Sequence, residues 1–387
     1  MEAALFYEFL HPQSSGFANP LKGQGKSEHE LFEEVLEQVS LAERVGFHSA
    51  WSVDHHLMSG HSHMPAPDVF FAAAAQRTRT IRFGTAVVVL PLAHPIMTAE
   101  RIAVLDQITG GRVEFGTGRG GHRRDYDAME VPYGENRERW EESLDLILRA
   151  WTETNFTFSG RFFNVSEPTT ISPRPIQRPH PPVWVATLGP DTPAIIGRKG
   201  LNLLTFSFFQ PLDAFADGIR KFREAAAEAG HDPNQLKIGA AIPIHVAETS
   251  KQAREDAAAL LQWYMLSSIE IVKPAVMKKG LPDNLKYMEK LFGMNLEKLT
   301  YDDFINNKRA VCGSPSECVE QLKPYVDLGC DLILGMFEFG GGVHAKVMRA
   351  IQLYGEQVLP EVRRMSRERS TRTRRGERVA VHAAAAS

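Results

Sequence analysis

The fold of this chain is decided by residues 81–120, which read IRFGTAVVVLPLAHPIMTAERIAVLDQITGGRVEFGTGRG. An apolar run rich in β-branched residues extends from 81 to 90 and stops at Pro91, which predicts a strand. Residues 95–108 have the pattern of a helix that ends at glycines, and another strand is expected at 113–116. Strand, helix and strand in this order predict two parallel strands joined by a crossover helix.

The same alternation continues on both sides of that stretch. We expect strands at residues 3–9, 49–53, 81–90, 113–116, 183–186, 202–206, 237–246 and 332–337. The helices that follow them are expected at residues 28–45, 68–77, 95–108, 137–151, 192–198, 212–229, 251–268 and 343–358. Such alternation predicts a parallel sheet, and eight units fit a closed barrel better than an open sheet. The predicted fold class is therefore α/β, a single (β/α)8 TIM barrel.

Three stretches fall outside this alternation. Residues 156–182 are expected to form a short hairpin followed by a proline-rich loop. Residues 269–310 are rich in Lys, Asn, Met and Asp, and an insertion of this length predicts a lid or a disordered segment, of which we expect a lid. We place the barrel domain at residues 1–362 and expect residues 363–387 to be a basic, disordered tail.

Composition excludes several classes of protein. The chain has 387 residues, of which 43% are hydrophobic and 24% charged, and these are globular values. Its three cysteines lie at 312, 318 and 330 without CxxC spacing, which argues against a disulfide framework or a zinc ribbon. Reduced cysteines, a first segment unlike a signal peptide and the lack of a run of about 20 apolar residues predict a cytoplasmic protein without a membrane span.

The net charge of −3 conceals an uneven distribution. Residues 363–378 contain eight arginines and two glutamates, a local charge of +6 that leaves −9 for the remainder. A basic segment is typical of proteins that bind nucleic acid or an anionic surface, but an acidic body argues against nucleic acid as the main ligand. We therefore expect a small-molecule substrate.

Asp54-His55-His56 directly follows the second expected strand. Catalytic residues of a barrel lie at the carboxyl ends of its strands, and a histidine there can act as acid or base near neutral pH. A buried structural histidine oriented by Asp54 is an equally good interpretation. His61 and His63 add to the cluster and raise the possibility of a metal site. They lie in a loop without fixed ligand geometry, so we expect no metal.

Residues 116–121 read GTGRGG, which matches the GxGxxG pattern of dinucleotide-binding folds. The pattern comes after three strand–helix units, and the polar residues that follow it, interrupted by Pro132, are not expected to open a helix. We therefore reject a Rossmann fold. A glycine-rich strand end that exposes Arg119 to a phosphate fits better, although a tight turn with a solvated arginine is the alternative.

Two further positions suit an anion. Arg137 lies near the start of a helix, where a basic side chain can add to the helix N-terminus, although it is equally consistent with a surface charge. The turn after the fifth strand offers backbone N–H groups and hydroxyls, and its candidate ligands are Thr187, Leu188, Gly189 and Thr192. An N-cap by Asp191 is the alternative there. Aromatic residues after the sixth strand, Phe206, Phe208 and Phe209, belong either to a pocket or to the core.

Several ordered stretches together resemble the bacterial luciferase family of flavin-dependent monooxygenases. They are AERVGFHSAWSVDHH (42–56), the block 81–120, the Arg137 helix, SPRPIQRPHPPVWVA (172–186), GSPSECVEQL (313–322) and GCDLIL (329–334). The resemblance covers roughly residues 1–362. It implies a (β/α)8 barrel that receives reduced FMN from a separate flavin reductase and reacts it with O2 to a C4a-(hydro)peroxide, which transfers one oxygen atom to an organic substrate. It also implies a homo-oligomer, a dimer or tetramer.

The resemblance assigns roles to individual residues. His55 is similar to the family's catalytic histidine, with His56 as its structural neighbour, and Asp125 to a carboxylate near the flavin ring. The two arginines that resemble the ligands of the FMN phosphate are Arg119 and Arg137. The dipeptide that matches a non-prolyl cis peptide under the flavin is Ala86-Val87.

The sequence departs from luciferase itself at two points. Leu188 and Gly189 stand where luciferase has a phosphate-binding serine, so phosphate contacts are expected from the backbone or from Thr192. Gly118 replaces a reactive cysteine, and long-lived light emission is not expected. Three alternatives stay open: hydride transfer with the deazaflavin F420 on the same fold, a metal-dependent barrel hydrolase, and a non-catalytic flavin-binding protein.

Overall fold

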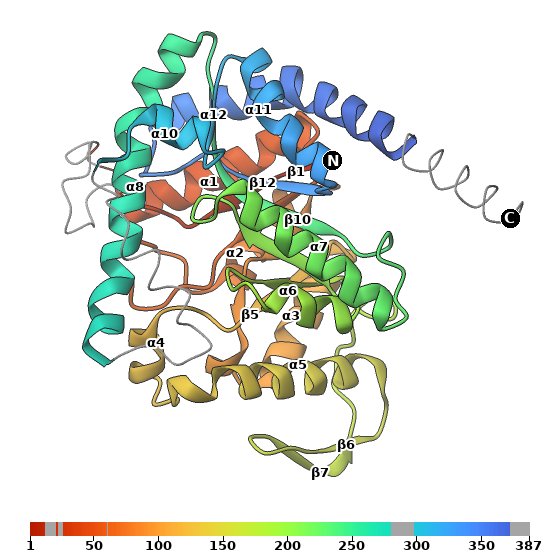
Figure 1. The fold of residues 1–387 in the computed structure, drawn as a ribbon. Coiled ribbons are helices and arrows are strands. Elements are labelled where there is room, and N and C mark those ends of the chain that lie inside the picture. The colour runs from red at the N-terminus through yellow and green to blue at the C-terminus, as the bar shows by residue number, and fades with distance from the viewer. Residues whose placement is uncertain (12–20, 22–25, 60, 280–297, 372–387) are drawn as a thin grey trace, which may run out of the picture.

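A ring of parallel strands forms the centre of the computed structural model, which describes residues 1–11, 21, 26–59, 61–279 and 298–371 (Figure 1). The ring strands are β1 (Glu2–Tyr7), β2 (Ser49–Ser52), β3 (Arg82–Thr85), β5 (Val113–Gly118), β8 (Val183–Ala186), β9 (Asn202–Phe206), β10 (Ile238–Val246) and β12 (Leu332–Met336). Each pairs in parallel with its neighbours, and β12 pairs with β1 to close the ring, with Ala4 opposite Leu334. The predicted barrel and its eight strand positions are confirmed.

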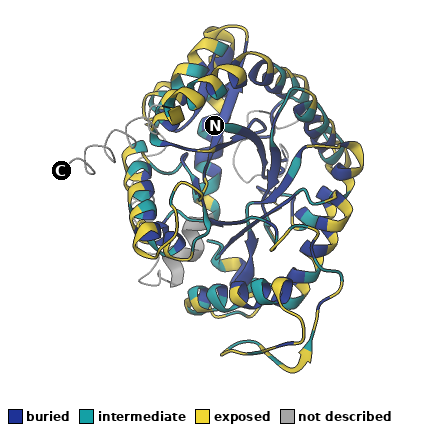
Figure 2. Cartoon of the chain, turned by 90° about the vertical axis from the view of Figure 1, so that its right-hand side faces the viewer, coloured by how far each residue is buried: buried dark blue, intermediate teal, exposed yellow. Residues whose placement is uncertain are grey.

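Helices surround this ring and turn one face toward it (Figure 2). They are α1 (Glu28–Arg44), α2 (Pro67–Arg77), α3 (Pro95–Thr109), α5 (Asn136–Thr152), α6 (Thr192–Arg198), α7 (Leu212–Glu228), α8 (Ser250–Lys279) and α12 (His344–Leu353). Local sequence sets their ends: Ser27 and Glu30 form a capping box at the start of α1, and Gly110 ends α3 with φ 67°. The predicted helices are confirmed within a few residues, except that α8 is longer.

Large side chains fill the barrel interior because glycines on neighbouring strands make room for them. A Cβ at Gly84 would lie 2.1 Å from the ring of Trp51, so only glycine fits opposite this tryptophan. The Trp51 and Trp184 rings meet edge to face at 5.6 Å. The Trp184 indole donates to Glu114, which forms an ion pair with Arg82. Side chains alternate between the two faces of a strand. The inward positions that follow this tryptophan layer toward the carboxyl ends of the strands therefore line the space at that end of the barrel.

A short helix, α4 (Arg123–Ala128), follows the glycine-rich end of β5, where the sequence predicted none. Most residues of this stretch are polar, but Asp125 and Tyr126 are buried and anchor the turn. The Met129 N–H donates to the Asp125 carbonyl at 3.0 Å. Tertiary burial thus outweighs weak local preference. The predicted hairpin is present as β6 (Phe156–Ser159) and β7 (Asn164–Thr169), antiparallel and projecting from the barrel beside α5 (Figure 1).

Part of the segment 269–310, which was expected to form a lid, consists of helices. Its first residues continue α8 to Lys279, and its last part contains α10 (Tyr301–Asn306). A further strand, β11 (Val311–Gly313), then pairs with the end of β10. Residues 280–297 lie outside the described residues, so the prediction of a lid stays a prediction.

The structured chain continues past the expected boundary at 362. The helix begun by α12 passes through a π-helical turn, η5 (Tyr354–Val358), and runs on to residue 371. Arg363 forms an ion pair with Glu2 and donates to the Gly46 carbonyl at 2.9 Å. Residues 363–371 are therefore helical rather than disordered, and 372–387 lie outside the described residues. All three cysteines are buried and unbridged.

None of the described helices combines the length and the apolar character that a membrane crossing requires.

Candidate active site

A cavity opens at the carboxyl ends of the strands, where barrels place their active sites. Each ring strand contributes residues from within it or from the segment that follows it. Its lining residues are Phe6, Glu8, Val53, His55, Ala86, Val87, Gly118, Arg119, Gly120, Gly121, Ala186, Thr187, Leu188, Leu204, Thr205, Phe206, Ala241 and Leu334. Six of the ten residues proposed from the sequence, His55, Ala86, Val87, Arg119, Thr187 and Leu188, are among them.

His55 leaves the end of β2 with its ring on the cavity wall. Its backbone N–H donates to the Met64 carbonyl at 2.9 Å, which fixes the loop. Burial, together with the neighbouring His122 ring, lowers the pKa of His55 to about 3. Within the described residues, the buried Nδ1 atom of His55 has no hydrogen-bond partner. The side chain is therefore a neutral imidazole near pH 7 with one ring nitrogen that makes no hydrogen bond within the described residues.

The other histidines of the cluster each face a different carboxylate. His56 Nε2 lies 3.1 Å from Asp54, His61 Nε2 2.9 Å from Glu8, and His63 Nδ1 2.7 Å from Glu28. Their rings thus point in three directions. Among the described residues, no group of three or more His, Cys, Asp or Glu side chains could hold a metal ion.

Asp125 reaches the same region from α4. A small cavity lies between His55 and Asp125, beside the central cavity. Its lining includes His55, Ala86, Val87, His122 and Asp125. Burial raises the pKa of Asp125 to about 6. His122 stands between the two proposed catalytic residues: its ring meets the His55 ring edge to face at 5.0 Å, and its Nδ1 lies 3.8 Å from Asp125. Sequence reasoning missed His122, although it directly follows the glycine motif.

The floor of the cavity is backbone. The Ala86–Val87 peptide is cis, as the resemblance predicted, and both residues line the cavity. A Cβ on Gly118 would lie 2.7 Å from Val87 Cγ2, and one on Gly120 would lie 2.7 Å from Val89 Cγ1. The glycines of the GTGRGG motif therefore allow two strand ends to approach each other and leave a smooth surface beside the cis peptide.

Arg119 lines the cavity beyond these glycines. Its Nη1 donates to the Asn136 side chain at 3.3 Å, and its own carbonyl accepts a hydrogen bond from the Tyr126 hydroxyl. Successive residues of a helix point about 100° apart, so α5 presents Asn136 to Arg119 and turns Arg137 elsewhere. Arg137 is half-buried and is not among the residues that line the described cavity. Its assignment to a phosphate stays a prediction, and Asn136 was missed.

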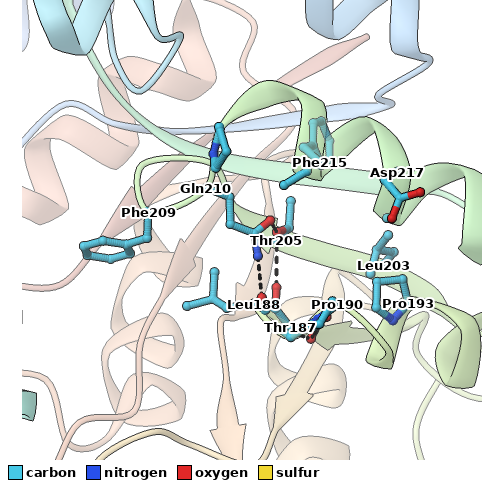
Figure 3. Close-up of a pocket in the computed structure, with 14 residues that line it drawn as sticks. Thr187, Leu188, Pro190, Pro193, Leu203, Thr205, Phe209, Gln210, Phe215 and Asp217 are labelled. Atoms are coloured by element: carbon cyan, nitrogen blue, oxygen red, sulfur yellow. Dashed lines mark hydrogen bonds between the residues drawn. The ribbon is translucent and has the colours of Figure 1, made fainter. Parts of the chain in front are cut away.

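The turn after β8 separates the central cavity from a second hollow beside α6 and α7 (Figure 3). Gln210 donates to the Leu188 carbonyl at 2.6 Å, and the Thr205 hydroxyl donates to the Thr187 carbonyl at 3.1 Å. The Gly189 N–H already donates to the Thr187 hydroxyl at 3.0 Å. The turn is therefore held by its own contacts, and its backbone has less free capacity for a phosphate than expected.

Two residues at the helix start also differ from expectation. Thr192 is buried as the first residue of α6 and lines neither hollow, while Gly189 lines the second hollow only. Asp191 occupies the N-cap position, but its side chain makes no capping hydrogen bond. The alternative of a plain Asp191 cap is wrong.

A carboxylate that the sequence did not suggest stands across the cavity from Arg119. Glu8 follows β1, is 5% exposed and lines the cavity. Burial acts to raise the pKa of Glu8, but hydrogen bonds from His61 and Tyr264 hold it below its ordinary value. Of the candidate aromatic residues, Phe206 lines the cavity, Phe209 lines the hollow of Figure 3, and Phe208 belongs to the core.

Comparison with known proteins gives a consistent result. The family model described as luciferase-like monooxygenase matches residues 14–332. The oxygenase component of a flavin-dependent trigonelline monooxygenase from Acinetobacter baylyi is 26% identical over 316 residues, covering 79% of this chain and 83% of that protein. An F420-dependent glucose-6-phosphate dehydrogenase from Amycolatopsis mediterranei is 27% identical over 340 residues, covering 85% and 94%. The crystal structure of monooxygenase RslO1 from Streptomyces bottropensis superposes with a TM-score of 0.77 at 25% identity, covering 93% and 99%.

Proposed function

Because the chain belongs to the luciferase-like monooxygenase family, we propose that it is the oxygenase component of a two-component flavin-dependent monooxygenase. It would take FMNH2 from a separate reductase and use O2 to insert one oxygen atom into an apolar or aromatic substrate, with water as the second product. The observation that carries this proposal is the neutral His55, which lines the cavity together with the cis Ala86–Val87 peptide and whose buried Nδ1 has no hydrogen-bond partner within the described residues.

The cavity fits a flavin by three features. The Val87 and Val89 side chains pack directly against the backbone of Gly118 and Gly120, so no side chain of these two glycines projects beside the cis peptide, where a flat ring can lie. Arg119 supplies a charged donor for a phosphate at the β5 side. Thr187 and Leu188 follow β8, the strand next to β5, and close that part of the wall with short or apolar side chains. When bound, a reduced flavin would supply the electrons that activate O2; the protein provides position, exclusion of water and proton transfer.

His55 and Asp125 divide the proton transfer between them. His55 is neutral and accepts a hydrogen bond or proton from the bound ligand at Nδ1. Asp125, with its pKa raised to about 6 by burial, exchanges protons close to physiological pH. His122 lies between them and keeps both side chains in place from its position at the start of α4.

A coupled assay tests the proposal. Purified protein is combined with a flavin reductase, NADH and FMN, and ketones, aldehydes and phenols are screened by mass spectrometry for a gain of one oxygen atom. We expect a product that requires this protein, FMN and the reductase together. Failure across the panel while FMNH2 binds would restrict the proposed substrate class, and failure to bind FMNH2 anaerobically would refute the proposed cofactor.

A second candidate function rests on the F420-dependent relative, which matches nearly the whole chain. The same cavity would then hold a deazaflavin and transfer hydride instead of oxygen. Anaerobic titration with FMNH2 and with reduced F420, followed by fluorescence, separates the two. We expect tighter binding of FMNH2; preference for F420 would favour the dehydrogenase.

We also propose that the protein is a homodimer. Val69 on α2 and Met97, Val104 and Ile108 on α3 are exposed apolar side chains on helices that pack together. Such a patch marks a protein interface. Light scattering during gel filtration should give twice the chain mass of 43.2 kDa, and a Val104→Asp variant should give the single mass. A wild-type monomer would contradict this.

A further inference from the structure

Glu8 brings a buried carboxylate to the wall of the cavity on the side of β1. Its Oε2 atom lies 2.9 Å from His61 Nε2, and the Tyr264 hydroxyl is its other partner. Burying an ionised carboxylate is costly unless its charge is balanced. The side chains around Glu8 therefore decide whether the charge of its carboxylate is balanced.

His61 contacts Glu8 through one ring nitrogen. Its ring stacks on Tyr264 with centroids 5.7 Å apart, and its Nε2 lies 2.9 Å from the Glu8 carboxylate. Its Nδ1 is buried and has no hydrogen-bond partner within the described residues. Burial acts to raise the pKa of Glu8, but the contacts with His61 and Tyr264 hold it below its ordinary value, so the carboxylate is ionised near pH 7.

No cation on the cavity wall compensates this charge at close range. Of the described residues that line the cavity, Arg119 is the permanent cation, and it stands on β5, three positions from β1 in the ring. A cofactor phosphate would occupy that arginine. His55, the other lining residue that could carry a positive charge, is neutral near pH 7.

Aromatic side chains line the same cavity as the carboxylate. Phe6 lies two residues before Glu8 on the same inward side, and its ring meets that of Phe206 at 5.9 Å. The Phe206 ring lies 6.5 Å from Tyr264, the partner of Glu8. A carboxylate framed by aromatic rings attracts a cation through its charge and through the ring faces, and it suits quaternary nitrogen, which is bulky and cannot donate a hydrogen bond.

We propose that the Glu8 side of the cavity binds the positively charged nitrogen of the substrate, so that the enzyme acts on aromatic or apolar compounds that carry a quaternary or protonated nitrogen. The inference rests on the proposed function only in calling the ligand a substrate. Glu8 then acts as a specificity-determining residue that places the cationic end at β1 and leaves the remainder of the molecule toward His55.

Two probes of equal shape test this directly. (4-Hydroxyphenyl)trimethylammonium and 4-tert-butylphenol differ in one atom and in charge. Both are titrated by calorimetry into the protein in excess FMN. We expect the cation to bind at least about tenfold more tightly, in keeping with one favourable buried charge contact. Equal affinity, or tighter binding of the phenol, would overturn the proposal.

The variant Glu8→Gln sharpens the test. Its amide oxygen still accepts from His61, so the fold is preserved while the charge is removed. We expect the preference for the cation to be lost, because the affinity for the cation falls more than the affinity for 4-tert-butylphenol. Glu338→Gln is the matched control, because Glu338 is also a buried carboxylate just beyond a strand end but does not line the cavity. A preference that survives in Glu8→Gln, or disappears equally in Glu338→Gln, would overturn the role of Glu8.

The readout is binding, so it does not depend on oxygenation. A cation preference without oxygen transfer to any compound would leave the inference standing and refute the monooxygenase. Oxygen transfer without a cation preference would support the monooxygenase and refute the inference about Glu8.

Discussion

The two sides of the cavity hold histidines in opposite settings. On the β2–β5 side, His55 has no carboxylate partner, its pKa is lowered to about 3, and its Nδ1 is unpaired within the described residues. On the β1 side, His61 is bound to Glu8 and stacked on Tyr264. The residues are six positions apart in one loop, so sequence alone makes them look alike. The difference shows that two histidines of one loop can have different partners, and we infer that the partner, rather than the position after a strand, separates their proposed roles.

Removal of His55 should have the largest effect on this contrast. His55→Ala takes away the acid–base group, and we expect product formation to fall by about 10²–10⁴-fold while O2 is still consumed and released as hydrogen peroxide. Peroxide and product are measured in the same coupled assay. His56→Gln, which changes a side chain paired with Asp54 and absent from the described cavity lining, should stay near wild type. Full coupling in His55→Ala would refute its role.

The next largest effect is expected on FMN affinity, where substitution of Arg119 and of Arg137 should give different losses. Arg119→Ala removes a charge-assisted contact in the cavity, and we expect FMN to bind more weakly by about 1–3 kcal/mol. Arg137→Ala should have a smaller effect, since that residue is not part of the described lining. Fluorescence titration of FMN measures both. Equal losses would show that α5 moves when the cofactor binds.

The burial of Asp125 should make the stability of the protein depend on pH. Its folded-state pKa of about 6 lies above its ordinary value, so the folded protein holds this proton more tightly and loses stability as pH rises through 6. Asp125→Asn lacks this penalty. We expect its free energy of unfolding to exceed that of the wild type by about 1–3 kcal/mol at pH 8, with no difference near pH 4. Urea unfolding at both pH values measures it, and a gain at pH 4 alone would contradict the assignment.

Gly118 should show the smallest of these effects. Gly118→Ala places a Cβ 2.7 Å from Val87 Cγ2, and we expect a loss of stability of about 1 kcal/mol. Gly121→Ala is the matched control, because nothing lies within 4 Å of its Cβ. Thermal unfolding compares the two. Equal melting temperatures would show that Val87 moves aside freely.

The barrel could be predicted from sequence because each strand–helix unit carries its own hydrophobic pattern, and some helices carry local end signals, as at Ser27 and Gly110. The ends of β2 and β5 could be predicted too, since histidines and glycines gather there in short motifs. Glu8 could not be found in this way, because its partners His61 and Tyr264 are 53 and 256 positions away. The short helix α4 and the helical residues 363–371 were missed because long-range contacts, not local preference, stabilise them.

Oxygen transfer from O2 tests the central claim most directly. The coupled assay is run with a flavin reductase, FMN and a substrate found in the screen, under ¹⁸O2. We expect the wild-type product to contain one ¹⁸O atom, and the amount of this labelled product to fall by about 10²–10⁴-fold in His55→Ala. A product that takes its oxygen from water, or one that forms without O2, would contradict a monooxygenase.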